Sequence, residues 1–139
     1  MEPRDHILAV VDTMEDYEST LGLAKDAIDH GGRATVLVHL GDSDRAHIRQ
    51  YAASEELALH EAETTYINAT LDRVRAFIGA DHAAASVTDQ VPDGRAVIES
   101  AVASEATAIT VPSRLVGRRS WRRAMARTPL NVIVTPVAA

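Results

Sequence analysis

Cysteine is absent from this chain of 139 residues. Without thiols, neither a disulfide framework nor a thiolate metal site can form, and a reducing compartment such as the cytoplasm is expected. Long apolar runs are missing as well, because the first one, residues 7–11, is too short for a signal-peptide core or a membrane span. We therefore expect one cytoplasmic domain, residues 1–139, whose length suffices for a hydrophobic core without staples.

Lysine is scarce: Lys25 is the only one, and the other thirteen basic residues are arginines. The formal net charge of −6 argues against a general nucleic-acid binder, which normally carries a positive charge. The charge is unevenly spread, since the segment from Arg114 to Arg127 holds six arginines and no acid. An alternative interpretation of the stretch from Arg118 to Arg127 is a basic face that binds nucleic acid or anionic membrane.

The motifs of several enzyme classes are absent too. No serine sits in a G-x-S-x-G elbow, and no G-x-G-x-x-G follows the first apolar run. His60-Glu61 begins like a zinc-protease helix, but Thr64 stands where the second histidine ligand belongs. We therefore expect no catalysis and no metal, and we interpret His39 as hydrogen-bonded structure.

Apolar runs rich in β-branched residues recur along the chain, at residues 7–11, 34–38, 107–111 and 130–135. Continuous runs without alternation are typical of parallel strands that are covered on both faces. Residues 83–88 form a weaker run, which suits the edge of a sheet.

Helical periodicity fills the intervals between these runs. Residues 17–30 carry an apolar stripe that ends at Gly31-Gly32, and residues 42–78 form a long helical region that ends at Gly79. The less regular stretch 46–59 predicts a break into two helices. The candidate N-caps of the whole helical region are Asp42, Ser43 and Asp44.

Two further helices are expected. Asp93 is the predicted cap of the first, in which Val97, Ile98, Ala101 and Val102 would face inward. Residues 120–127 form the second and shorter one. Alternation of strand and helix along the whole chain predicts an α/β fold with an open, doubly wound sheet.

The order and wording of these segments resemble the universal stress protein family. The resemblance rests on Ile7–Asp12, on "GGRATVLVHL" ending at Leu40, on Pro92–Ile98, and on Thr128–Pro136. It implies a single five-stranded parallel sheet in the order 3-2-1-4-5, with helices on both faces and a ligand crevice at the carboxyl ends of strands one and four. It also implies a homodimer through the last strand, Leu130 to Thr135, and covering this apolar edge is physically favourable.

Nucleotide-binding members of that family carry a glycine, two residues, a second glycine, and later a glycine followed by serine or threonine. Glycines let backbone amides approach phosphates closely, and the helix that follows adds partial positive charge. This chain departs from the pattern: Pro112 and Leu115 occupy the first two glycine positions, and Arg119-Ser120 the last. Gly117 is the one glycine left in a loop that is also shorter.

The residues that the resemblance places at the crevice are Asp12, Thr13, Ser113, Arg114, Gly117, Arg118, Arg119 and Ser120. Our hypothesis is a regulatory or stress-response domain with a degenerate nucleotide site, which acts by binding an unidentified protein partner or a small anion and needs no cofactor. The alternative is a true adenine-nucleotide binder, with weak ATP hydrolysis, in which arginine forks replace the glycine loop. Trp121 would stack on a base or an arginine, or its ring would pack against the sheet or a dimer partner, which is the simpler expectation.

Overall fold

The computed structural model describes residues 5–11, 17–79, 85–90 and 93–135. In chain order the elements are β1 (His6–Val11), α1 (Tyr17–Asp29), β2 (Arg33–Val38), α2 (Asp42–Ser54), α3 (Leu59–Ile78), β3 (Ala85–Gln90), α4 (Gly94–Ala103), β4 (Ala108–Pro112), α5 (Ser113–Val116), α6 (Arg119–Arg127) and β5 (Asn131–Thr135). This succession confirms the predicted α/β class.

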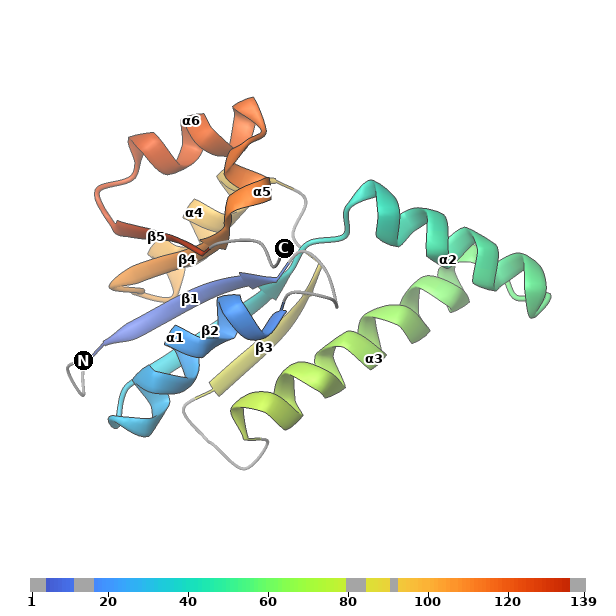
Figure 1. Ribbon diagram of the computed structural model, residues 1–139, viewed down its shortest axis with the longest axis horizontal. Helices are drawn as coiled ribbons and strands as arrows, with labels where there is room; N and C mark the ends of the chain where they lie inside the picture. Colours follow the sequence, from blue (N-terminus) through green and yellow to red (C-terminus); the bar gives the residue numbers. More distant parts are fainter. Residues whose placement is uncertain (1–4, 12–16, 80–84, 91–92, 136–139) are drawn as a thin grey trace.

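The strands form one parallel sheet in the order β3-β2-β1-β4-β5 (Figure 1). β1 and β4 lie inside the sheet and are buried at every position, which explains their largely apolar sequence. β3, the weakest run in the sequence, is an edge strand as expected. Its pairing with β2 is irregular between Val36 and Val38.

Helices cover both faces of the sheet. On one face, α1 and the end of α3 bury Leu21, Ile28 and Val74 against the strands. On the opposite face, α4, α5 and α6 bury a second apolar cluster that includes Leu115 and Trp121. The chain therefore changes face between β1 and β4, as a doubly wound sheet requires.

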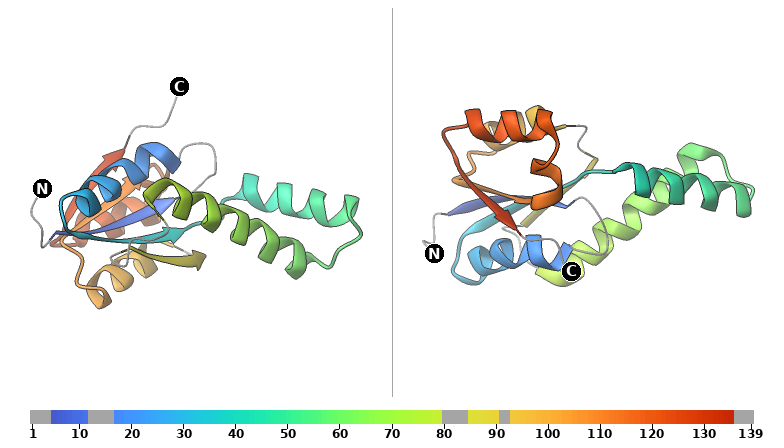
Figure 2. Two further views of the ribbon diagram at one scale, coloured as in Figure 1. Left: turned by 90° about the horizontal axis from the view of Figure 1, so that it is seen from below. Right: turned by 45° about the horizontal axis from the view of Figure 1, so that its top comes forward.

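The long helical region between β2 and β3 breaks into two helices, as its irregular sequence predicted. α2 and the first half of α3 form a hairpin that projects from the sheet (Figures 1 and 2) and has its own small apolar cluster. At the turn, Glu56 adopts φ 54°, and the amide of Leu57 donates to the carbonyl of Ala52 (N···O 2.9 Å). This is the backbone pattern that ends a helix and reverses the chain.

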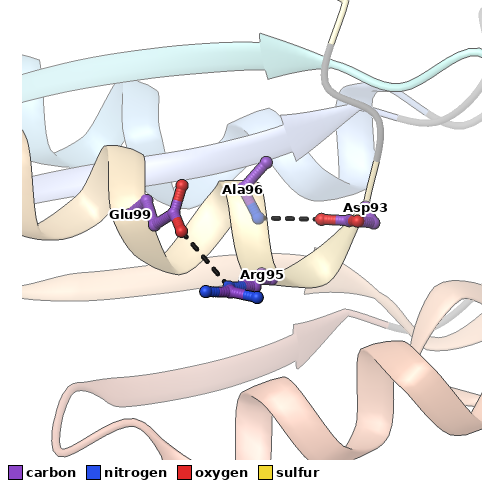
Figure 3. A network of polar contacts seen from close by, with 4 residues as sticks. All are labelled: Asp93, Arg95, Ala96 and Glu99. Atoms are coloured by element: carbon purple, nitrogen blue, oxygen red, sulfur yellow. Dashed lines mark hydrogen bonds and ion pairs between the residues drawn. The ribbon is translucent and has the colours of Figure 1, made fainter.

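The helix ends confirm some predicted caps and correct others. Asp93 caps α4 by accepting a hydrogen bond from the amide of Ala96 at 2.9 Å (Figure 3). α2 begins differently from the prediction, because Gly41 is its N-cap and the Asp44 carboxylate reaches back to the Gly41 amide at 3.0 Å. At the end of α1, Gly31 has φ 86°, whereas a Cβ on Gly32 would lie 2.6 Å from the carbonyl oxygen of Asp5.

The prediction that four residues of α4 face inward is wrong for one of them, Val102. Val97 and Ala101 are buried and Ile98 is half-buried, but Val102 is 67% exposed. The apolar stripe read from the sequence was therefore one residue too wide. A helix lying on a sheet buries a narrow stripe, and its flank remains in solvent.

Candidate functional site

The candidate site lies where β1 and β4 end side by side. These strands pair in parallel from Ile7 with Ala108 to Ala9 with Thr110, and the chain leaves them toward opposite faces of the sheet. A crevice opens at such a switch point, and ligands of doubly wound proteins bind there. Of the predicted site residues, Asp12 and Thr13 lie outside the described residues.

A helical turn, which the sequence did not predict, follows β4 directly. Pro112 is still a strand residue, buried and in register with Thr135 of β5, and α5 begins at the next position. Leu115 points back into the protein and is only 1% exposed. The position at which the family pattern has its second glycine therefore carries a core side chain.

Two backbone amides at the end of this turn are engaged within it. The amide of Gly117 donates to the carbonyl of Ser113 (N···O 3.2 Å), and that of Arg118 to the carbonyl of Leu115 (N···O 3.0 Å). Pro112 has no amide hydrogen to offer. These three positions therefore provide no cradle of outward-facing amides for a phosphate chain.

Gly117 does not use the conformational freedom of glycine. Its φ is −68° and its ψ is −24°, which is ordinary helical backbone. A Cβ built there would meet the carbonyl oxygen of Arg114 at 3.4 Å, which is an ordinary contact distance. Alanine therefore fits this position, and the last glycine of the loop is not required by its backbone.

α6 separates its side chains by chemistry. Trp121 and Met125, one helical turn apart, are buried against the sheet and α4. Trp121 is 2% exposed, which confirms the packing interpretation and leaves no ring face for a base. Gly94 of α4 permits this close approach, because a Cβ there would lie 3.1 Å from the Cα of Trp121.

The arginines of α5, α6 and the turn between them are exposed. In the described part of the chain, the structure records no ion pair for the following exposed arginines: Arg118, Arg119, Arg122, Arg123 and Arg127. The two recorded ion pairs join Arg75 to Asp72 and Arg95 to Glu99. Pairing with acids of the long helix within one copy, which would have explained the cluster, is not seen among these residues.

His39 is a site residue whose role the sequence did not reveal. It follows β2, is 5% exposed, and its backbone amide donates to the carbonyl of Val11 at 2.7 Å. Its ring meets that of Trp121 edge to face, with 5.2 Å between centroids and 84° between planes. The sequence around either residue does not indicate this contact, because the two rings come from distant parts of the chain.

The environment of His39 disfavours its charged form. Burial lowers the pKa of the imidazole below its usual 6.5, and the nearby Arg118 charge lowers it further, while Asp44 opposes the shift. Among the described residues, its Nδ1 atom has no hydrogen-bond partner. The expectation of a hydrogen-bonded structural histidine is confirmed for the backbone of His39, which is buried, but not for the Nδ1 atom of its ring, which packs against Trp121.

The remaining predicted site residues lie together on one stretch of chain. Ser113 is half-buried at the start of α5, whereas Arg114, Gly117, Arg118, Arg119 and Ser120 are exposed between there and the first turn of α6. The stretch is electropositive and open to solvent. It is suited to binding an anion through side chains rather than through backbone.

The described residues contain no cluster of three or more histidine, aspartate or glutamate side chains that would hold a metal ion. None of the described helices has the length and apolar character needed to cross a membrane.

Comparisons with known proteins identify the fold. No protein-family model matches this chain, and no curated protein matches it in sequence. Its structural neighbours across nearly its full length are universal stress proteins. One, from Archaeoglobus fulgidus and solved in complex with dAMP, is 17% identical with a TM-score of 0.62, over 97% of this chain and 99% of that chain.

A second universal stress protein, solved in complex with cAMP, is 12% identical with a TM-score of 0.57, over 97% of this chain and 98% of that chain. A further structure from Archaeoglobus fulgidus is 18% identical with a TM-score of 0.59, over 95% and 93% of the two chains. At these identities the likeness establishes a shared α/β fold.

Proposed function

We propose that this protein is a cytoplasmic regulatory domain of the universal stress protein type, which acts by binding rather than by catalysis and whose nucleotide site is degenerate. The observation that carries the proposal is the burial of Leu115 in the core immediately after β4. Phosphates held by backbone need small residues with close-approaching amides here, and the Leu115 side chain together with Pro112, which has no amide hydrogen, stands in their place.

A second candidate function is the binding of an adenine nucleotide through arginine side chains. It is favoured by the exposed Arg118 and Arg119, for which the structure records no ion pair with any described residue. The solved relatives contain dAMP and cAMP, each with a single phosphate. One phosphate demands fewer contacts than three, and an arginine fork can bind it bidentately.

Calorimetric titration with ATP, ADP, AMP and cyclic AMP tests the proposal. We expect no binding in the micromolar range, and a micromolar dissociation constant for any of the four would overturn the degenerate site. If a nucleotide binds, the double variant Arg118→Ala with Arg119→Ala identifies its anchor, because the arginine hypothesis requires loss of that affinity. The matched control is Arg33→Ala, which replaces an exposed arginine at the amino end of β2.

We further propose that the protein forms a homodimer through β5. This strand is an edge of the sheet, and Val134 on it is 48% exposed. An apolar edge strand with unpaired backbone groups favours association with a second copy. Val134→Lys should convert the dimer to a monomer in sedimentation velocity, whereas Val102→Lys on the exposed flank of α4 should not. A dimer unaffected by Val134→Lys would contradict this interface.

A further inference from the structure

A groove runs between α4 and α6, on the face of the molecule that carries the arginines. Its volume is about 580 Å³, and Ile98, Ala124 and Pro129 contribute an apolar floor. Polar and charged side chains form its rim: Arg95, Glu99, Ser120, Arg123, Arg127 and Thr128. The groove is thus built for an occupant that has an apolar centre and a charged border.

The border has a net positive charge. Arg95 is neutralised by Glu99, one turn further along α4, with 3.3 Å between the Arg95 Nε and a carboxylate oxygen (Figure 3). Arg123 and Arg127 have no recorded ion pair within the described residues. An occupant with acidic groups around an apolar side chain would therefore complement the groove.

The turn between α2 and α3 has that chemistry. Leu59, the first residue of α3, is a large aliphatic side chain that is 52% exposed there. Exposed carboxylates of Glu55, Glu56 and Glu61 surround it in sequence, and residues 50–72 contain no lysine or arginine. The hairpin tip, residues 55–61, is thus an apolar knob with carboxylates on its loop side, while Arg45 and Arg49 of α2 share a small pocket with Leu59 on the other side.

Knob and groove cannot meet within one molecule. The hairpin projects beyond the sheet, and its tip lies at the opposite end of the molecule from α6 in each view (Figures 1 and 2). We infer that the groove between α4 and α6 receives the hairpin tip of a second copy of this chain, with Leu59 on the apolar floor and the tip carboxylates beside Arg123 and Arg127.

Two copies in antiparallel orientation satisfy both contacts at once, because each then presents a tip to the groove of the other. Such a two-fold pair is closed. A seven-residue tip buries less surface than the roughly 1,200–2,000 Å² of a stable interface, so the pairing is weak and depends on concentration. It is also a separate contact from the pairing proposed for β5.

A charge exchange tests this contact. All proteins carry Val134→Lys, so that β5 pairing does not contribute. The tip variant has Glu55→Lys, Glu56→Lys and Glu61→Lys, and the groove variant has Arg123→Glu and Arg127→Glu. Each should self-associate at least about tenfold more weakly than the parent in sedimentation velocity. An equimolar mixture of the two should restore association, because both contacts are again between opposite charges.

Matched controls carry the same charge changes elsewhere. Glu18→Lys, Asp26→Lys and Asp29→Lys replace exposed acids of α1, and Arg33→Glu with Arg73→Glu replaces exposed arginines. We expect both controls to associate like the parent. Parent association should also weaken between 0.1 M and 1 M salt, as the Debye length falls from about 10 Å to about 3 Å.

Three results would overturn the inference. A parent that stays monomeric at high concentration would assign the groove to another occupant, such as a foreign acidic protein. A mixture that associates no better than its components would exclude the charge complementarity. An equal loss of self-association in the control variants would show that the change in net charge, and not the tip–groove contact, causes the weakening. If the Val134→Lys parent stays monomeric but the protein with native Val134 forms a dimer, the tip–groove contact fails and the β5 proposal stands. The failure of one proposal is therefore distinguishable from the failure of the other.

Discussion

Two segments leave the carboxyl edge of the sheet on the side of the crevice, and they solve the same problem in opposite ways. The segment after β4, residues 113–127, folds back at once and buries Leu115 and Trp121. The segment after β2, residues 41–78, extends outward as a hairpin with a small core of its own. The first is basic and anchored by the main core, whereas the tip of the second is acidic and exposed. The first segment is thus held by the main core, and the second exposes its tip to solvent.

The largest effect should come from removing the anchor of the first segment. Trp121→Ala takes a fully packed ring out of the core and should lower the free energy of unfolding by roughly 3–5 kcal/mol, as judged by urea denaturation. Leu59→Ala, on the exposed hairpin tip, should change it by less than about 0.5 kcal/mol. Similar losses for the two variants would contradict the division between them.

Leu115→Ala tests whether this side chain is core or a barrier to a ligand. Because it is buried, its loss should cost roughly 2–5 kcal/mol of unfolding free energy. The variant should gain no ATP affinity in calorimetry, since the helical turn and Pro112 persist. Val102→Ala, on the exposed flank of α4, is the control and should be nearly neutral. Micromolar ATP binding by Leu115→Ala would show that the side chain alone blocks an otherwise competent site.

The hairpin depends on a polar contact where the first segment depends on packing. The hydroxyl of Tyr66 on α3 donates to a carboxylate oxygen of the buried Asp44 on α2 at 2.5 Å. Tyr66→Phe should therefore cost about 1.5–3 kcal/mol, the range for a hydrogen bond to a charged group. Tyr51→Phe removes a hydroxyl from an exposed ring of α2 and should have no measurable effect in the same denaturation experiment. Equal effects would argue against this tie between the helices.

The smallest effect should be a dependence on pH at the junction of the two segments. Burial, with the Arg118 charge, lowers the pKa of His39 below 6.5 in the folded protein. As pH falls below 6.5 the unfolded chain takes up a proton that the folded protein does not, so stability is lost on acidification.

His39→Phe keeps an aromatic ring against Trp121 and removes this titration. The unfolding free energy of the variant should therefore fall less steeply from pH 7 to pH 5 than that of the parent. The exposed His47→Phe serves as control and should keep the parental slope. His6 contributes in the same direction in all three proteins, because burial and Arg33 lower its pKa too. An unchanged slope in His39→Phe would exclude His39 as a source of the dependence.

The sequence by itself determined the elements and the class of the fold. Apolar runs without alternation marked the buried strands, and the weak run at β3 marked an edge. Gly31, Gly79 and Asp93 stood at helix ends because their backbone freedom or side-chain oxygen suits those positions. The separation of acidic from basic segments was also legible, since charge is a property of the residues alone.

Only the tertiary structure decided which of these residues cooperate. From the sequence, Leu115 was a bulky side chain at a glycine position of a loop, whereas in the structure α5 places it in the core. Val102 belongs to the apolar stripe of α4 by its spacing, but it lies on the exposed flank of that helix. The contact of His39 with Trp121 joins residues from distant parts of the chain. Periodicity encodes the face of one element, whereas burial and a shifted pKa depend on what another element places against that face. The physical reason is that packing is a property of pairs of surfaces, and a single sequence segment contains only one of them.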